Sequence, residues 1–147
     1  MTLPELKHDR FVPEKGLRII VQVPETRVQR IIDAVLAEDD LKYGDYDRVT
    51  FRTAPGVQRF RSLGSGRNAA TGRVAEVACV ELSFFLPGSE ARAVKVLETV
   101  YSSHPYEEPV VFVEPCVRTL HIRGLDEDNP NRFWNSAAED WVPAEHR

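Results

Sequence analysis

The pattern of a hydrophobic strand, a proline and an amphipathic helix occurs twice in this sequence, and this repeat limits the possible folds more than any other feature. In the first copy, residues 21–24 (VQVP) precede apolar residues at helical spacing from Val28 to about Ala37. In the second copy, residues 84–87 (FFLP) precede Ser89, a residue type that favours the N-cap of a helix. Each half of the chain therefore predicts a strand that leads directly into a helix.

Further strands are predicted beside these two units. Apolar and polar residues alternate over residues 17–23, and residues 49–53, 74–86 and 110–113 are rich in β-favouring side chains. Pro115 is expected to close the last strand. The order strand–helix–strand–strand–helix–strand predicts an α+β, ferredoxin-like βαββαβ fold with both helices on one face of an antiparallel sheet. The first and third strands are expected at the centre, and the second and fourth at the edges.

Apolar side chains are predicted on both faces of this sheet, although two helices cover only one. The strand residues concerned are Phe84, Phe85, Val111 and Val113. The second helix is expected to direct Ala93, Val94, Leu97, Val100 and Tyr101 inward. An uncovered apolar face and free strand edges are usually covered by oligomerisation or by another segment of the chain. We therefore expect a homotrimer or a higher assembly.

The two ends of the chain differ in character from its middle. Residues 1–16 lack periodicity and indicate an N-terminal arm, residues 17–118 contain the predicted fold, and residues 119–147 form a C-terminal extension. The extension contains both tryptophans, Trp134 and Trp141, and large aromatic side chains favour burial. We expect the extension to pack on the body or on a neighbouring subunit.

The composition argues against several classes of partner. The 147 residues are 42% hydrophobic and 29% charged, which is ordinary for a globular domain. A formal net charge of −4 gives no overall attraction to nucleic acid or anionic lipid. With neither a signal peptide nor an apolar run of membrane-spanning length, a cytoplasmic protein without nucleic-acid or membrane partners is expected. Cys79 and Cys116 fall on predicted strands that are not neighbours, which favours free thiols.

Residues 104–109 (HPYEEP), here called the hexapeptide, concentrate several reactive groups in one short segment. They combine the imidazole of His104, the phenol of Tyr106 and the carboxylates of Glu107 and Glu108 between two prolines that stiffen the backbone. Imidazole and carboxylate ligands suit zinc, manganese or iron, so His104, Glu107 and Glu108 are candidate ligands of a divalent metal ion. In the structural alternative, His104 only caps the preceding helix and the glutamates are solvated.

A basic, glycine-bearing segment is predicted to form a long hairpin before the third strand. Its arginines, together with those that precede it, are Arg48, Arg52, Arg59, Arg61, Arg67 and Arg73. Backbone amides exposed by Gly64 and Gly66 suit a phosphate group, although the spacing and the Lys-Ser/Thr ending of a P-loop are absent. Gly64 and Gly66 are therefore candidate ligand-binding residues.

The region from Leu17 to about Pro115 resembles the PII-like, CutA-like insert domain of the Nif-three-like family. The resemblance rests on the hexapeptide and on upstream matches at Gly44, Tyr46, Phe51, Phe60, Gly64, Ser65, Gly66 and Gly72. It implies a ferredoxin-like fold related to PII and CutA proteins, which commonly form trimers, and it makes Tyr46 and Tyr106 candidate ligand-binding residues. Four dispersed histidines cannot supply the separate di-metal domain of the full-length family, so the chain resembles a free-standing insert.

The residues and the resemblance together imply a non-enzymatic, trimeric binding or regulatory module. It would take a divalent metal ion or another small ligand near the hexapeptide. One alternative is a small metal-dependent hydrolase in which His104 and Glu107 or Glu108 perform acid–base chemistry. Another is a module that only docks onto a protein partner. Neither a nucleophile-elbow pattern nor an HExxH motif accompanies the histidine, so catalysis is the less favoured interpretation.

Overall fold

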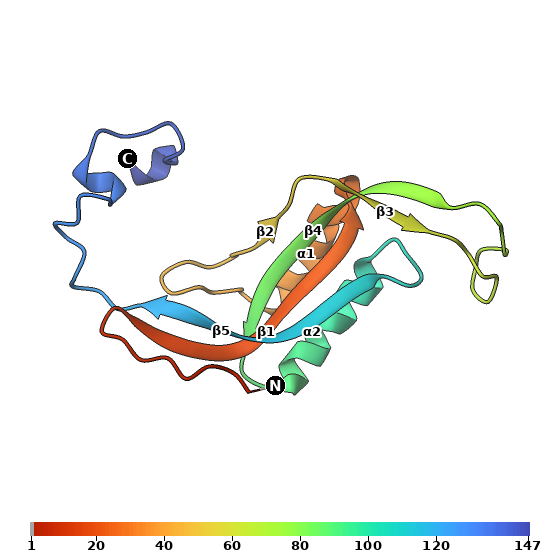
Figure 1. Cartoon of the computed structure of the whole chain (residues 1–147), viewed down its shortest axis with the longest axis horizontal. Helices are drawn as coiled ribbons and strands as arrows, with labels where there is room; N and C mark the ends of the chain where they lie inside the picture. The colour runs from red at the N-terminus through yellow and green to blue at the C-terminus, as the bar shows by residue number, and fades with distance from the viewer. Residues whose placement is uncertain (1) are drawn as a thin grey trace.

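Two long apolar strands, β1 (Phe11–Pro24) and β4 (Ala75–Pro87), form the centre of an antiparallel sheet (Figure 1). The structure is a computed structural model that describes residues 2–147. The other elements are η1 (Glu25–Arg27), α1 (Val28–Glu38), β2 (Phe51–Arg52), β3 (Gly56–Phe60), α2 (Glu90–Ser103), β5 (Val110–His121), η2 (Phe133–Asn135) and η3 (Ala144–His146). The strand order is β2-β4-β1-β5, and β3 pairs with β4 on the same edge as β2. The predicted ferredoxin-like fold is confirmed.

The core lies between the sheet and the two helices, which cover the same face. Its most deeply buried side chains are Ile19, Val21, Val23, Ile31, Val35, Val80, Leu82, Val96 and Val100. Alternate strand residues and every third or fourth helix residue point to one side, so these elements present continuous apolar surfaces to one another. Full burial of one such aliphatic side chain contributes about 1.5–3 kcal/mol.

Two local predictions are confirmed. The side chain of Ser89 accepts a hydrogen bond from the backbone amide of Arg92 (3.4 Å) and so caps α2. Cys79 lies on β4 and Cys116 on β5, two strands separated by β1, and both thiols are free.

The predicted inward face of α2 is partly wrong. Ala93 and Val100 are buried, but Val94 and Tyr101 are 63% and 56% exposed, and Val96 is buried instead. Because a helical turn takes 3.6 residues, Val96 lies on the same face as Ala93 and Val100. Val94 and Tyr101 are each one residue further along, which rotates them about 100° away from the core.

Strands β1 and β5 are both longer than the sequence indicates. The first begins at Phe11 rather than near residue 17, and the last continues through Pro115 to His121. Phe11 pairs with His121, and Leu17 pairs with Pro115. Proline is tolerated here because β5 is an edge strand, where a missing N–H can face away from the neighbour. Residues 11–16 of the expected N-terminal arm therefore belong to the sheet.

The predicted hairpin is confirmed: β3 and β4 form it, and residues 61–74 form its tip. The strand expected over residues 49–53 is shorter than predicted, since only β2 (Phe51–Arg52) pairs with β4. Pro55 lies between β2 and β3, and its missing N–H interrupts the ladder. The edge of the sheet is consequently open between the two short strands.

The C-terminal extension stands away from the sheet and does not cover its open face (Figure 1). Trp134 and Trp141 are 49% and 65% exposed, so packing of both indoles on the body of the same chain is not observed. Phe133 makes edge-to-face contacts with both tryptophans. Val142 is buried within the extension. The extension thus forms a small aromatic cluster of its own.

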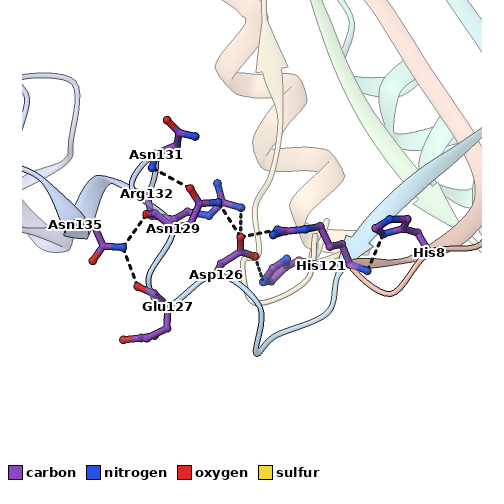
Figure 2. A network of polar contacts seen from close by, with 9 residues as sticks. His8, His121, Asp126, Glu127, Asn129, Asn131, Arg132 and Asn135 are labelled. Atoms are coloured by element: carbon purple, nitrogen blue, oxygen red, sulfur yellow. Dashed lines mark hydrogen bonds and ion pairs between the residues drawn. The ribbon is translucent and has the colours of Figure 1, made fainter.

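One buried carboxylate fastens the extension to the N-terminal part of the chain. Asp126 accepts hydrogen bonds from Arg10 and Arg132, each at 2.6 Å, and from the Asn129 amide at 3.2 Å (Figure 2). His121 lies 3.6 Å from the other carboxylate oxygen. The Arg10 hydrogen bond is the main reason why the pKa of Asp126 is lowered. No sequence pattern pointed to this cluster.

Candidate functional site

The hexapeptide begins as the C-terminal cap of α2 and is anchored by His104. The His104 backbone amide donates to the Val100 carbonyl (3.0 Å), and the side chain is only 8% exposed. The Tyr106 amide donates to Nδ1 (3.0 Å), which requires an unprotonated Nδ1. Nε2 lies 2.7 Å from the Gln22 carbonyl, so the hydrogen-bond network assigns the ring proton to Nε2.

His104 is therefore a neutral histidine with both ring nitrogens occupied. Burial lowers its pKa, and the hydrogen bond to Gln22 opposes this only in part. A metal ion needs a free imidazole lone pair, and so does a general base. In this arrangement the one available lone pair, on Nδ1, is used by the Tyr106 amide.

Tyr106 connects the hexapeptide to the sheet. Its hydroxyl lies 3.6 Å from the Cys79 sulfur, and its ring contacts His104 and Phe60 at centroid distances of 4.9 and 6.2 Å. Burial and the hydrogen bond with Cys79 raise the pKa of Tyr106 to about 12. The phenol consequently stays protonated at neutral pH.

Glu107 connects the hexapeptide to the tip of the hairpin. Its two carboxylate oxygens lie 3.1 and 3.3 Å from the backbone nitrogen of Arg67, which donates to them. Glycine at position 66 leaves room for the Glu107 carboxylate, because a Cβ there would press on the flexible end of that side chain and displace it. The structure thus brings together four predicted site residues: His104, Tyr106, Glu107 and Gly66.

The other predicted site residues do not join this group. Glu108 is exposed, and Gly64 lies in the hairpin tip with φ +89°, packed against Ala70. Tyr46 lies in the loop after α1, with its ring 6.3 Å from that of His146 in the extension. Gly64 serves the turn, since left-handed backbone favours glycine.

The side chains of His104, Glu107 and Glu108 do not converge on one point in residues 2–147. Within residues 2–147, no three side chains from His, Cys, Asp and Glu lie close enough together to hold a metal ion. The physical reason is that the His104 lone pair and the Glu107 carboxylate both accept main-chain amide protons. The hexapeptide in this structure is a junction between helix, sheet and hairpin.

A pocket that the sequence did not reveal lies next to this junction. It has a volume of about 390 Å³ and opens at the gap between β2 and β3. Its lining residues are Gln22, Thr53, Ala54, Gly56, Val57, Gln58, Cys79, Val80 and Glu81. Small-molecule sites are usually concave and largely apolar with a few convergent polar groups; this hollow supplies the polar groups but is open on one side.

The polar groups of the pocket form a directed chain of hydrogen bonds. The Cys79 thiol lies 3.7 Å from the side-chain oxygen Oε1 of Gln58, and Nε2 of Gln58 donates to Oε1 of Gln22 (2.9 Å). Nε2 of Gln22 in turn donates to the Glu81 carboxylate (3.1 Å). The chain therefore ends on a charged acceptor at the surface. Only strand pairing reveals it, since Gln22 and Glu81 face each other across β1 and β4.

An apolar row crosses the uncovered face beside this pocket. Cross-strand pairing aligns Phe51 with Ser83, Ser83 with Ile20, and Ile20 with Phe112. Phe51 and Phe112 are 68% and 48% exposed. The expectation that neighbouring strand residues carry apolar side chains on both faces agrees with the structure: Phe84 is buried beneath the helices, and Phe85, the next residue along β4, lies on the opposite face. The row adds Phe51, Ile20 and Phe112, which were not among the residues predicted for this face, to the apolar surface of the open face, and Ser83 is its one polar member.

A second hollow, of about 720 Å³, lies at the opposite end of the sheet. Its charged groups are largely paired: Arg92 with Asp39, and Arg118 with Glu14 at 2.6 Å. The Arg118 guanidinium also lies over the rings of Phe85 and Tyr43, at 4.2 and 4.6 Å from their centroids. These side chains hold the loop after α1 against the sheet.

Neither helix of residues 2–147 has both the length and the apolar character that crossing a bilayer requires.

No protein-family model and no curated protein matches this sequence. Similarity is found instead among solved structures. A Bacillus cereus protein related to NIF3 matches 72% of this chain with 24% identity and a TM-score of 0.59, but the match spans only 27% of that longer protein. CutA from Synechococcus elongatus matches 75% of this chain and 86% of its own length, with 20% identity and a TM-score of 0.52. CutA1 from Oryza sativa matches 79% and 85%, with 19% identity and a TM-score of 0.50. This chain thus has the ferredoxin-like fold of CutA proteins and of part of a NIF3-related protein.

Proposed function

We propose that this chain is a non-enzymatic binding module that works as a homotrimer and holds a small polar ligand in the pocket of Gln22, Gln58 and Glu81. One observation carries the proposal: the pocket adjoins the apolar row on the uncovered sheet face. Gln22 and Glu81 lie two residues along their strands from Ile20 and Ser83 of that row. A second subunit packed on the row would therefore also close the open side of the pocket.

The apolar row supports self-association. Exposed Phe51 and Phe112 stand at the two ends of the row that contains Ile20 and Ser83, on a face that no segment of residues 2–147 covers (Figure 1). Contiguous apolar surface of this kind is typical of protein–protein contacts. The CutA-like fold is the further support, because the family resemblance implies trimers.

The chemistry of the pocket favours binding over catalysis. His104, the best candidate for a general base, has no free lone pair, and the Tyr106 phenol holds its proton. The donors of the pocket point along the chain towards Glu81, whose exposed carboxylate keeps free acceptor capacity. A matching ligand is a small molecule with N–H or O–H donors.

The assembly is tested by analytical ultracentrifugation of the full chain. Phe112→Asp places a charge in the apolar row, and a charge buried without a partner is costly, so we expect monomers at micromolar concentration. Val94→Asp is the matched control, because Val94 is an exposed valine on α2. It should leave the trimer intact. A wild-type monomer, or equal effects of both substitutions, would contradict the proposed assembly.

The ligand is tested by native mass spectrometry of the purified protein. We expect one retained small molecule per subunit in the wild type, and its loss in Glu81→Gln, which removes the charge at nearly constant shape. Glu98→Gln, on the exposed side of α2, is the control and should retain the molecule. Identical spectra without any bound molecule in all three proteins would refute the pocket as a ligand site.

A further inference from the structure

Positive and negative charges are concentrated at opposite ends of the folded molecule. The hairpin of residues 56–75, here called the arginine hairpin, contains four arginines and no acidic residue. Residues 124–147 contain six carboxylate side chains against two arginines and no lysine. In a chain whose net charge is −4, the hairpin is thus a local exception, and its opposite lies in the extension.

Both sets of charges are exposed and largely unpaired. Within residues 2–147, Arg61, Arg67 and Arg73 have no carboxylate within ion-pair distance, whereas Arg59 lies 3.7 Å from Glu76. On the extension, the exposed carboxylates without an arginine or lysine partner in the described chain are Glu127, Asp128, Glu139, Asp140 and Glu145. Unpaired charges of opposite sign are the usual basis of complementary surfaces.

Apolar side chains accompany the charges at both ends. On the arginine hairpin, Val57 is 65% exposed, Phe60 43% and Leu63 79%. The extension offers the exposed indoles of Trp134 and Trp141. Arginine stacks favourably on the face of tryptophan, so the two surfaces match in aromatic as well as in ionic character.

The two surfaces cannot meet within one chain. The arginine hairpin and the extension project from opposite ends of the long axis of the molecule (Figure 1). Both are held in place: the Arg67 amide is bound by Glu107, and Asp126 fastens the extension to Arg10. A contact between them therefore requires two copies of the chain.

We propose that the C-terminal extension of one copy docks onto the arginine hairpin of a second copy. The contact is head-to-tail, so it joins unlike surfaces and closes into a ring when the rotation between copies permits. The hairpin tip is bound to the hexapeptide through Glu107, so docking of the extension on the hairpin would also act on the hexapeptide beside the pocket. The docking does not depend on the apolar row and is separable from the trimer proposed above.

The two tryptophans of the chain both lie in the extension, so tryptophan fluorescence reports docking directly. We expect acrylamide quenching of the full-length protein to decrease as protein concentration rises, and to increase again with salt, which screens ion pairs. The triple variant Arg61→Glu, Arg67→Glu and Arg73→Glu should abolish the concentration dependence. Arg27→Glu, Arg30→Glu and Lys95→Glu form the matched control, since these exposed cations lie before and along the helices, and should leave it unchanged.

The decisive variant reverses both surfaces in one chain. Asp128→Lys, Asp140→Lys and Glu145→Lys should abolish shielding alone, and should restore it when combined with the three hairpin substitutions. Restoration also shows that each set of substitutions folds. Quenching that is independent of concentration, or a combined variant that stays unshielded, would overturn the docking. One further result would overturn it: the wild-type protein binds a single-stranded oligonucleotide through the arginine hairpin, and the variant of the extension shows the same tryptophan quenching as the wild type.

The outcomes also separate this docking from the proposed trimer. A sedimenting trimer whose tryptophans are quenched equally at all concentrations and in the hairpin variant would retain the trimer and refute the docking. Shielding that survives in Phe112→Asp, together with restored shielding in the doubly reversed chain, would retain the docking even if no trimer forms.

Discussion

At the scale of single residues, the most reactive-looking side chain of the sequence has a structural role. His104 holds the end of α2 to β1 through Gln22 and fixes the turn through the Tyr106 amide. Both partners are main-chain groups, and buried main-chain groups need hydrogen bonds. The imidazole is suited to this position because its two nitrogens serve a donor and an acceptor at once.

Replacing His104 should therefore destabilise the fold. His104→Ala leaves the Gln22 carbonyl and the Tyr106 amide without their partner, and each unsatisfied buried group costs about 1–3 kcal/mol. We expect a loss of that order in the free energy of unfolding, measured by urea denaturation. His146→Ala, at an exposed position, should change it by less than about 0.5 kcal/mol. Equal effects of the two substitutions would show that the His104 hydrogen bonds contribute nothing.

The same histidine makes stability depend on pH. Burial lowers the pKa of His104 from its ordinary value of 6.5, so the unfolded chain binds the proton more readily than the folded chain. Its contribution is complete above about pH 6.5 and is lost as the pH falls through the lower, folded pKa. Between about pH 7 and pH 5, stability should fall more steeply in the wild type than in His104→Ala. Parallel curves from denaturation at each pH would contradict this.

Gly16 lies where the neighbouring strand leaves no room for a side chain. A Cβ at this position would lie 2.5 Å from Cζ of Phe85 and closer still to the Leu86 carbonyl oxygen. Gly16→Ala should destabilise the protein by about 1–3 kcal/mol, as overpacking usually does. Gly72→Ala is the control, because nothing lies within 4 Å of the added carbon. Thermal unfolding compares the two, and an unchanged midpoint for Gly16→Ala would mean that Phe85 moves aside freely.

At the scale of elements, the hexapeptide couples three parts of the fold. It ends α2, starts β5 and holds the hairpin tip, although the tip is about 40 residues away along the chain. The coupling depends on Glu107, whose carboxylate accepts a main-chain amide, a charge-assisted bond that is stronger than a neutral one. Motion of the hairpin is therefore expected to depend on this one side chain.

Glu107→Ala should release the hairpin tip without unfolding the sheet. We expect the Arg67 amide to exchange with solvent faster, because its acceptor is removed, while amides of β1 and β4 keep their protection. Glu108→Ala, at the adjacent exposed glutamate, should leave the Arg67 amide unchanged. Hydrogen exchange by NMR distinguishes the two variants. Equal exchange at Arg67 in both would show that the tip is held by other contacts.

At the scale of the whole molecule, the chain consists of a layered body and a separate C-terminal extension. The extension has its own aromatic cluster, and the Asp126 network is a principal point of its attachment (Figure 2). A buried carboxylate between two guanidinium groups is stable only while all three charges are present. The position of the extension, and with it the docking proposed above, thus depends on one ionised group.

Asp126→Asn should loosen the extension selectively. The amides of Asn129 and Arg132, which are hydrogen-bonded within the extension, should exchange faster, whereas the core strands should be unaffected. Asp128→Asn is the exposed control and should have no effect. Because the pKa of Asp126 is lowered from its ordinary value of 3.8, the ionised carboxylate stabilises the fold above that pH. This stabilisation is lost as the pH falls through the lower pKa of the folded state. Wild-type loosening is therefore expected only below about pH 4. Loosening already at neutral pH would refute this role.

The sequence by itself determined the order of elements, the ferredoxin-like topology, the Ser89 cap and the free cysteines. These properties follow from local periodicity and from the few ways in which a duplicated strand–helix unit can pack. Prediction from the sequence was wrong where a local preference of one residue opposed pairing between distant strands. Pro115 indicates a strand end, but β5 continues past it because pairing with β1 outweighs one missing edge donor.

The tertiary structure alone decided which polar groups meet. The hexapeptide brings an imidazole and two carboxylates within six residues, yet in the folded chain His104 and Glu107 each accept a main-chain amide proton from a different segment. Conversely, Gln22, Gln58 and Glu81 are far apart in the sequence and meet only through strand register. Side-chain chemistry is encoded locally, but its geometry depends on contacts between distant segments, which no local pattern specifies.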